Sequence, residues 1–73
     1  MIKTVQANQA FQVINGGFSA NIPTACYLWL SADGVTYYKY EDEEIKVGNL
    51  QVQGIKNGTY CKFDAGSDIV VLL

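Results

Sequence analysis

A chain of 73 residues has room for one domain, and a domain of this size buries only about 60% of the surface that its unfolded form exposes. The net charge is −2, and the chain contains no histidine and no arginine. This composition disfavours a zinc site, which usually needs histidine or closely spaced cysteines, and a nucleic-acid interface, which usually relies on arginine. We therefore expect one domain over residues 1–73, with no metal, no other cofactor and no nucleic-acid partner.

The low content of charged residues indicates whether the protein has partners. Charged residues make up 16% of the chain, against about 25% in typical soluble domains. A surface this poor in charge indicates that a partner covers part of it, and small domains often gain stability by forming oligomers. No apolar run approaches the roughly 18 residues of a membrane span, so we expect no membrane partner.

Short apolar or alternating segments, separated by Gly, Asn and Asp, recur from one end of the chain to the other. No stretch has the apolar spacing of a helix over 11 or more residues. The strand-like segments are 2–6, 9–14, 18–20, 24–31, 35–40, 45–47, 50–55, 59–63 and 69–73. Their spacing predicts an all-β fold, a small antiparallel β-sandwich or barrel of about seven or eight short strands.

The segment 24–31 is the strongest of these. Tyr27 and Trp29 share one face of it, and Cys26, Leu28 and Leu30 share the other. Because both faces are apolar, we expect this strand to lie centrally in a two-layer core or at an interface.

Two turn signals predict hairpins. Asp33-Gly34 separates 24–31 from 35–40, and Asn57-Gly58 separates 50–55 from 59–63. Both dipeptides favour tight turns between paired strands.

The last segment, 69–73, consists of five consecutive apolar residues. Such a strand is either buried centrally within one domain or forms a contact between subunits. Exposed to water, it would be an aggregation hazard.

Cys26 and Cys61 lie 35 positions apart, each within an apolar segment. The N-terminal residues 1–6 lack the apolar stretch of a signal peptide, so we expect free, buried thiols. A disulfide is the alternative, and it depends on geometry that the sequence does not show.

The acidic run 41–44 is best interpreted as a solvated loop. A contact with calcium or with a cationic partner is the alternative, although the run lacks the spacing of an EF-hand loop. With no histidine to act as a base, neither a Ser-His nor a Cys-His pair is possible, and we expect the protein not to be an enzyme.

Aromatic residues gather in neighbouring segments. Three interpretations stay open: packing within the core, anchors of a protein interface, or a platform for sugar rings. The residues concerned are Tyr27, Trp29, Tyr37, Tyr38, Tyr40 and Tyr60.

The residues 30–37, Leu-Ser-Ala-Asp-Gly-Val-Thr-Tyr, are followed by Gly-Thr-Tyr-Cys-Lys-Phe at 58–63 and by an apolar last strand. This pattern resembles small β-sandwich virion proteins of tailed bacteriophages. The resemblance implies a capsid-decoration, head-fibre or tail-associated protein, made in the host cytoplasm and located in the virion. It also implies a homo-oligomer, often a trimer, bound to a larger assembly such as a capsid, and it carries over no catalytic residues.

We therefore expect a structural protein that acts by assembly. A carbohydrate- or surface-binding module that uses exposed Tyr and Trp side chains is the alternative function. The residues expected to form contacts are Trp29, Tyr38, Tyr40, Ile69, Val71 and Leu73.

Overall fold

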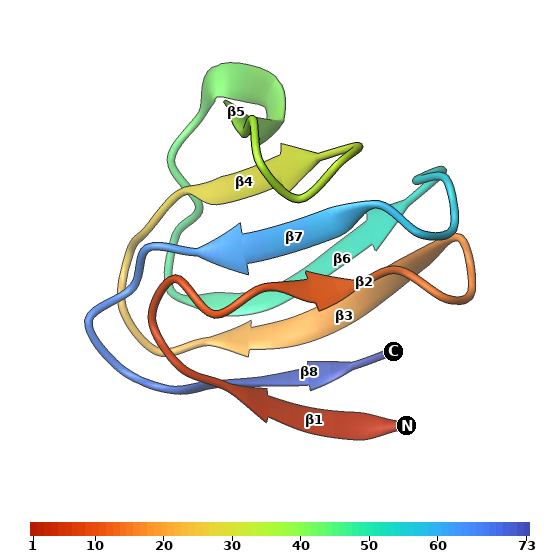
Figure 1. The fold of residues 1–73 in the computed structure, drawn as a ribbon. Helices are drawn as coiled ribbons and strands as arrows, with labels where there is room; N and C mark the ends of the chain where they lie inside the picture. The colour runs from red at the N-terminus through yellow and green to blue at the C-terminus, as the bar shows by residue number, and fades with distance from the viewer.

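The computed structural model describes all residues from 1 to 73 and contains eight strands in two antiparallel sheets (Figure 1). Sheet A has the strand order β1-β8-β3-β6, and sheet B has the order β2-β7-β4-β5. The all-β prediction is confirmed, and the architecture is that of a small sandwich. The strands are β1 (Ile2–Val5), β2 (Phe11–Gln12), β3 (Gly17–Ile22), β4 (Leu28–Ser31), β5 (Tyr38–Lys39), β6 (Gly48–Gln53), β7 (Tyr60–Phe63) and β8 (Ile69–Leu72).

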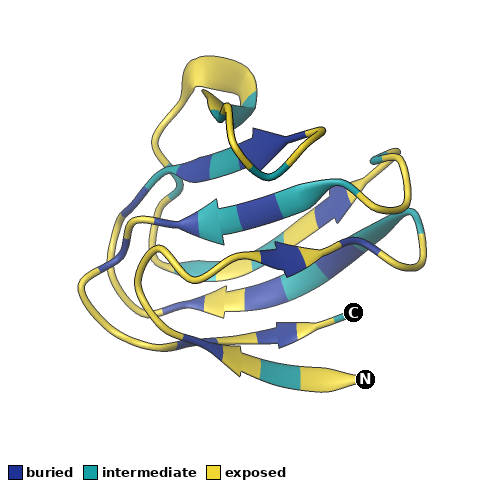
Figure 2. Ribbon diagram, in the orientation of Figure 1, coloured by how far each residue is buried: buried dark blue, intermediate teal, exposed yellow.

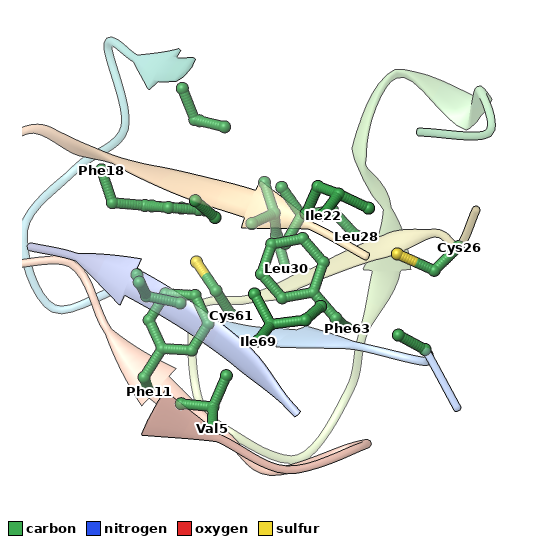
Figure 3. Close-up of a cluster of buried hydrophobic side chains, with 14 of the residues drawn as sticks. Val5, Phe11, Phe18, Ile22, Cys26, Leu28, Leu30, Cys61, Phe63 and Ile69 are labelled. Atoms are coloured by element: carbon green, nitrogen blue, oxygen red, sulfur yellow. The ribbon is translucent and has the colours of Figure 1, made fainter. Parts of the chain in front are cut away.

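Both sheets contribute buried residues (Figure 2), and the side chains of these residues form one hydrophobic core (Figure 3). Within it, the ring of Phe18 from sheet A meets the rings of Phe11 and Phe63 from sheet B edge to face, with centroids 5.0 Å and 6.2 Å apart. Phe11 and Phe63 are stacked at 6.0 Å. Edge-to-face and offset stacking are the favourable geometries of aromatic pairs, so the three rings bind the two sheets together.

Where polar and apolar residues alternate along a strand, the structure confirms which residues face the core and which face outward. Val52 points into the core, with Leu50 packed against its edge, while Gln51 and Gln53 are exposed. In β4, Leu28 and Leu30 are buried, and the strand lies between β7 and β5, as its two apolar faces indicated. The side-chain period of two thus places these residues correctly.

The hairpin predicted at Asn57-Gly58 is wrong, because β6 belongs to sheet A and β7 to sheet B. The turn instead carries the chain from one sheet to the other. It is fixed to the β2–β3 connection by hydrogen bonds from Gly58 N to Val13 O (2.8 Å) and from Gly16 N to Asn57 Oδ1 (2.7 Å). A turn sequence specifies a local reversal, and it does not specify which sheet receives the next strand.

The hairpin at Asp33-Gly34 does join paired strands, β4 and β5, but its loop is longer than a tight turn. The register pairs Leu30 with Tyr38, so the intervening residues form a wide loop and β5 shrinks to two residues. The segment 45–47 is likewise reduced to a single bridge between Ile45 and Cys26.

The acidic run is exposed, as expected for a solvated loop. It overlaps a short 3-10 helix, η1 (Tyr40–Asp42), in which Glu41 and Asp42 have positive φ angles of 55° and 48°. No helix in the structure is long and apolar enough to cross a membrane.

Cys26 and Cys61 are both free and buried, as expected. Burial raises the pKa of the Cys61 thiol to about 12. Burial also raises the pKa of Cys26, and the carboxylates of Asp64 and Glu44 add to this effect. Both side chains therefore act as small apolar groups at neutral pH.

Gly17 is required by the close approach of β3 and β6, because a Cβ at this position would overlap the carbonyl of Val52. We predict that Gly17→Ala lowers the free energy of unfolding by about 1–3 kcal/mol, as overpacking does elsewhere. Gly66→Ala is the control, since a Cβ there meets nothing within 4 Å. Urea unfolding of both variants tests this, and equal effects of the two substitutions would contradict it.

Candidate interaction surfaces

The outer face of sheet A carries no charged side chain. Alternation along β1, β3, β6 and β8 turns every second residue away from the core, and the cross-strand register brings these residues into rows. Solvent-facing sheet positions usually carry charges that keep a domain soluble. The outward residues are Ile2, Thr4, Gly17, Ser19, Asn21, Asn49, Gln51, Gln53, Val70 and Leu72.

One half of this face is apolar. Ile2 lies opposite Leu72, and Val70 is the next outward residue of β8. Their exposed fractions are 72%, 52% and 49%, so three large aliphatic side chains meet water side by side. Together with Ser19 and Asn21 of β3 they line a shallow hollow of about 220 Å³.

The other half of the face consists of amides. Asn21 lies opposite Asn49, and Gln51 and Gln53 follow on β6. A primary amide has both donors and an acceptor, so such a surface can pair with a copy of itself.

The outer face of sheet B differs in chemistry, because lysines and aromatic rings alternate across it. The Lys39 ammonium lies 4.2 Å from the centre of the Tyr27 ring and 5.6 Å from that of Trp29. The Lys62 ammonium lies 4.2 Å from the centre of the Tyr37 ring. Each such cation–π contact stabilises by about 0.5–1 kcal/mol at an exposed site.

Asp64 fixes the orientation of this aromatic row. Its carboxylate accepts a hydrogen bond from the Trp29 indole N–H (3.1 Å) and another from the Tyr27 backbone N–H (2.7 Å). The side chains of Asp64 and Trp29 also border a hollow of about 420 Å³. The lining residues are Asn8, Trp29, Val35, Tyr37, Lys62 and Asp64.

The two predicted contacts in the last strand, Ile69 and Val71, are wrong. Both side chains point into the core, with exposed fractions of 1% and 0%. β8 lies between β1 and β3, and its inner face is covered by sheet B. The side chains at the surface are those of the intervening residues, Val70 and Leu72.

The other predicted contact residues are divided between the core edge and the surface. Tyr40 and Leu73 are half-buried against the core. Trp29 is half-buried on the outer face of sheet B, and Tyr38 is exposed. No single surface therefore brings the predicted set together.

The sequence does not predict Ile2, Val70 and Leu72 as one group of surface residues. The side-chain period of two in a strand could have indicated Val70 and Leu72, because in an apolar run one set of alternate residues must face outward. The register that places Ile2 beside Leu72 depends on the pairing of the first and last strands, which no local pattern shows.

The acidic run 41–44, for which a calcium contact was the alternative prediction, borders a hollow of about 320 Å³ near the start of β6. Glu41, Glu43 and Glu44 line it together with Lys46. No group of three or more His, Cys, Asp or Glu side chains in the structure is arranged to hold a metal ion.

No protein-family model, no curated protein and no solved structure matches this chain. The resemblance to bacteriophage virion proteins therefore stays a prediction. The chemistry of the two outer faces is what bears on function.

The loop between β4 and β5 is organised by the Asp33 carboxylate. Hydrogen bonds from the N–H groups of Thr36 (3.0 Å) and Val35 (2.9 Å), and from the Ser31 hydroxyl (2.9 Å), lower the pKa of Asp33 to about 2. The ionised form is favoured by these donors in the folded state.

We predict that the stability contributed by Asp33 is present above pH 4 and is lost as the pH falls from about 4 to about 2. Stability decreases toward low pH because the pKa of Asp33 in the folded protein lies below the ordinary value of 3.8, so protonation favours the unfolded state. NMR titration of the Asp33 carboxyl group measures this directly. A midpoint near 3.8 in the folded protein would contradict the assigned hydrogen bonds.

Proposed function

We propose that this domain is a non-enzymatic structural subunit that assembles with copies of itself through the outer face of sheet A. The observation that carries the proposal is the absence of charge across that entire face, combined with the exposed side chains of Ile2, Val70 and Leu72. Depletion of charge is the compositional mark of the centre of a protein interface.

The apolar half of the face supplies the driving force for association. Full burial of an aliphatic side chain stabilises by about 1.5–3 kcal/mol. Ile2, Val70 and Leu72 each have about half or more of their surface left to bury, so each contributes roughly 1 kcal/mol on contact with a partner.

A second copy of the chain is the partner that this face fits best. The face offers no charge pattern for an oppositely charged surface to match. Its amides at Asn21, Asn49 and Gln51 are self-complementary, since each offers donors and an acceptor. A surface that packs against itself generates a two-fold axis, whereas the trimer implied by the phage resemblance needs two different surfaces in contact.

The proposed role in a larger assembly rests on the outer face of sheet B. When sheet A is covered by a copy, the aromatic and lysine side chains of the opposite face stay accessible. Trp29 and Tyr37 are the kind of anchors that protein interfaces favour. This arrangement suits a virion subunit that decorates a capsid or builds a fibre, as the resemblance implies.

We predict that Val70→Lys shifts the protein to a smaller species and weakens association by roughly tenfold or more. The added ammonium would lie unpaired within the apolar contact, at a cost above the ~1.4 kcal/mol that a tenfold change represents. Sedimentation velocity at micromolar concentrations measures the change. Val35→Lys, the same substitution at an exposed residue remote from this face, should leave the mass unchanged. Equal masses of wild-type protein and Val70→Lys would contradict the proposal.

Binding of a saccharide to sheet B is the second candidate function. The observation in its favour is the hollow beside Trp29, where an oriented indole ring, a second ring from Tyr37 and the Asp64 carboxylate converge. An apolar wall with a few fixed polar groups is typical of small-ligand sites.

We predict that a saccharide bound there changes the fluorescence of Trp29, the one tryptophan of the chain. Tyr37→Ala should remove binding on a glycan array because it removes one wall of the hollow. Tyr38→Ala is the matched control, since this neighbouring tyrosine does not line the hollow. No binding to any glycan, or equal binding by the two variants, would eliminate this candidate.

A further inference from the structure

Four strands lie at the sheet edges: β1 and β6 in sheet A, and β2 and β5 in sheet B. Unpaired edges invite pairing with other chains, and proteins protect them with short strands, lysine, proline or charges that point inward. β2 and β5 have only two residues each, and β5 contains Lys39. β1 carries Lys3 on its inward side, where it is half-buried. Three of the four edges are thus protected.

β6 has none of these devices within its own residues, and the acidic run borders only its start, where Glu43 and Glu44 line a hollow with Asn49 and Leu50. It is six residues long and contains no charged residue and no proline. Its pairing with β3 runs from Gly48 to Gln53 without interruption, so no bulge bends it away from a partner. Figure 1 shows β3 beside β6 in sheet A, and the sheet order places no strand on the other side.

The backbone groups on the free side of β6 can be identified. Because a Cβ on Gly17 would overlap the Val52 carbonyl oxygen, that carbonyl points toward β3. In an antiparallel pair, alternate residues direct their N–H and C=O groups to opposite sides. The groups of Asn49, Gln51 and Gln53 therefore point away from β3. None of the backbone hydrogen bonds outside regular pairing reaches these residues.

We propose that this edge pairs antiparallel with β6 of a second copy, which joins two copies of sheet A into one continuous eight-stranded sheet. The inference rests on the proposed self-assembly and adds a second contact, through the edge of sheet A rather than through its face. Addition of a strand to an exposed edge is an established mode of recognition, in which main-chain hydrogen bonds hold the partner.

The side chains of β6 favour a copy as the occupant. An antiparallel pair centred on Gln51 places this residue opposite its counterpart and places Asn49 opposite Gln53 of the copy. All of these side chains are primary amides, which can both donate and accept hydrogen bonds across the pair. No like charges meet between the paired residues Gly48–Gln53, since β6 contains no charged residue.

The test compares Gln51→Pro with Gln51→Ala. Proline removes the outward N–H of residue 51 and leaves the β3 pairing intact, as prolines at natural sheet edges do. Alanine removes the same side chain and keeps the N–H. Native mass spectrometry of these variants, alone and combined with Val70→Lys, then separates the two contacts.

We expect wild-type protein to form species larger than two copies, because it has both contacts. Gln51→Pro should leave dimers held by the face, and Val70→Lys should leave dimers held by the edge. The double variant should be a monomer. Gln51→Ala, which lacks the same side chain but keeps the N–H, should form larger species than Gln51→Pro, so the difference between these two variants reports on the edge alone. If Gln51→Pro matches wild type while Val70→Lys is a monomer, the edge contact is refuted and the face contact stands. If Val70→Lys matches wild type while Gln51→Pro loses mass, the proposed face contact fails and the edge contact stands.

A second test, with charged substitutions at the same position, keeps the proposal testable if the proline variant does not fold. On the Val70→Lys background, which removes the face contact, Gln51→Lys and Gln51→Glu should each lose the edge contact, because like charges then meet at the centre of the pair. An equimolar mixture should recover it as a mixed pair of the two masses. Failure of the mixture to form mixed species, with both variants folded by circular dichroism, would overturn the proposal.

Discussion

The packing of three phenylalanine rings in a single shared layer is the constraint on which the rest of the structure depends. Phe18 from one sheet closes on Phe11 and Phe63 from the other, and a chain of 73 residues has no second core to supplement them. Almost every connection along the chain crosses between the sheets, β4 to β5 being the exception. Most contacts are therefore distant in sequence, and a fold of this kind forms slowly because loops must close before the contacts stabilise it.

A single core layer also determines what the surface must be. Every strand has one face in the core, and the other face is left to meet water or a partner. On sheet A these outer faces combine into an uncharged surface with an apolar half beside Val70 and Leu72. On sheet B they combine lysines with aromatic rings around Trp29. Two surfaces of different chemistry suit a subunit that contacts its copies on one side and another body on the other.

Local pattern was enough to predict the fold class and the faces of alternating strands such as 50–53. It failed where the sequence does not alternate. The run 69–73 conceals which residues face the core, so it predicts contacts for Ile69 and Val71, whose side chains are buried in the core. It failed again at Asn57-Gly58, because a turn does not reveal the sheet to which the next strand belongs. The uncharged face emerges only from the registers that pair β8 with β1 and β3, and β3 with β6, which join residues from the whole length of the chain.

The proposed assembly buries the outer face of sheet A against a second copy. A mixture of 13C-labelled and unlabelled protein, studied by isotope-filtered NOE spectroscopy, tests it most directly because only contacts between copies give signals. We expect intermolecular NOEs to the methyl groups of Ile2, Val70 and Leu72. Intermolecular NOEs confined to other surfaces, or none at concentrations up to the millimolar range, would contradict it.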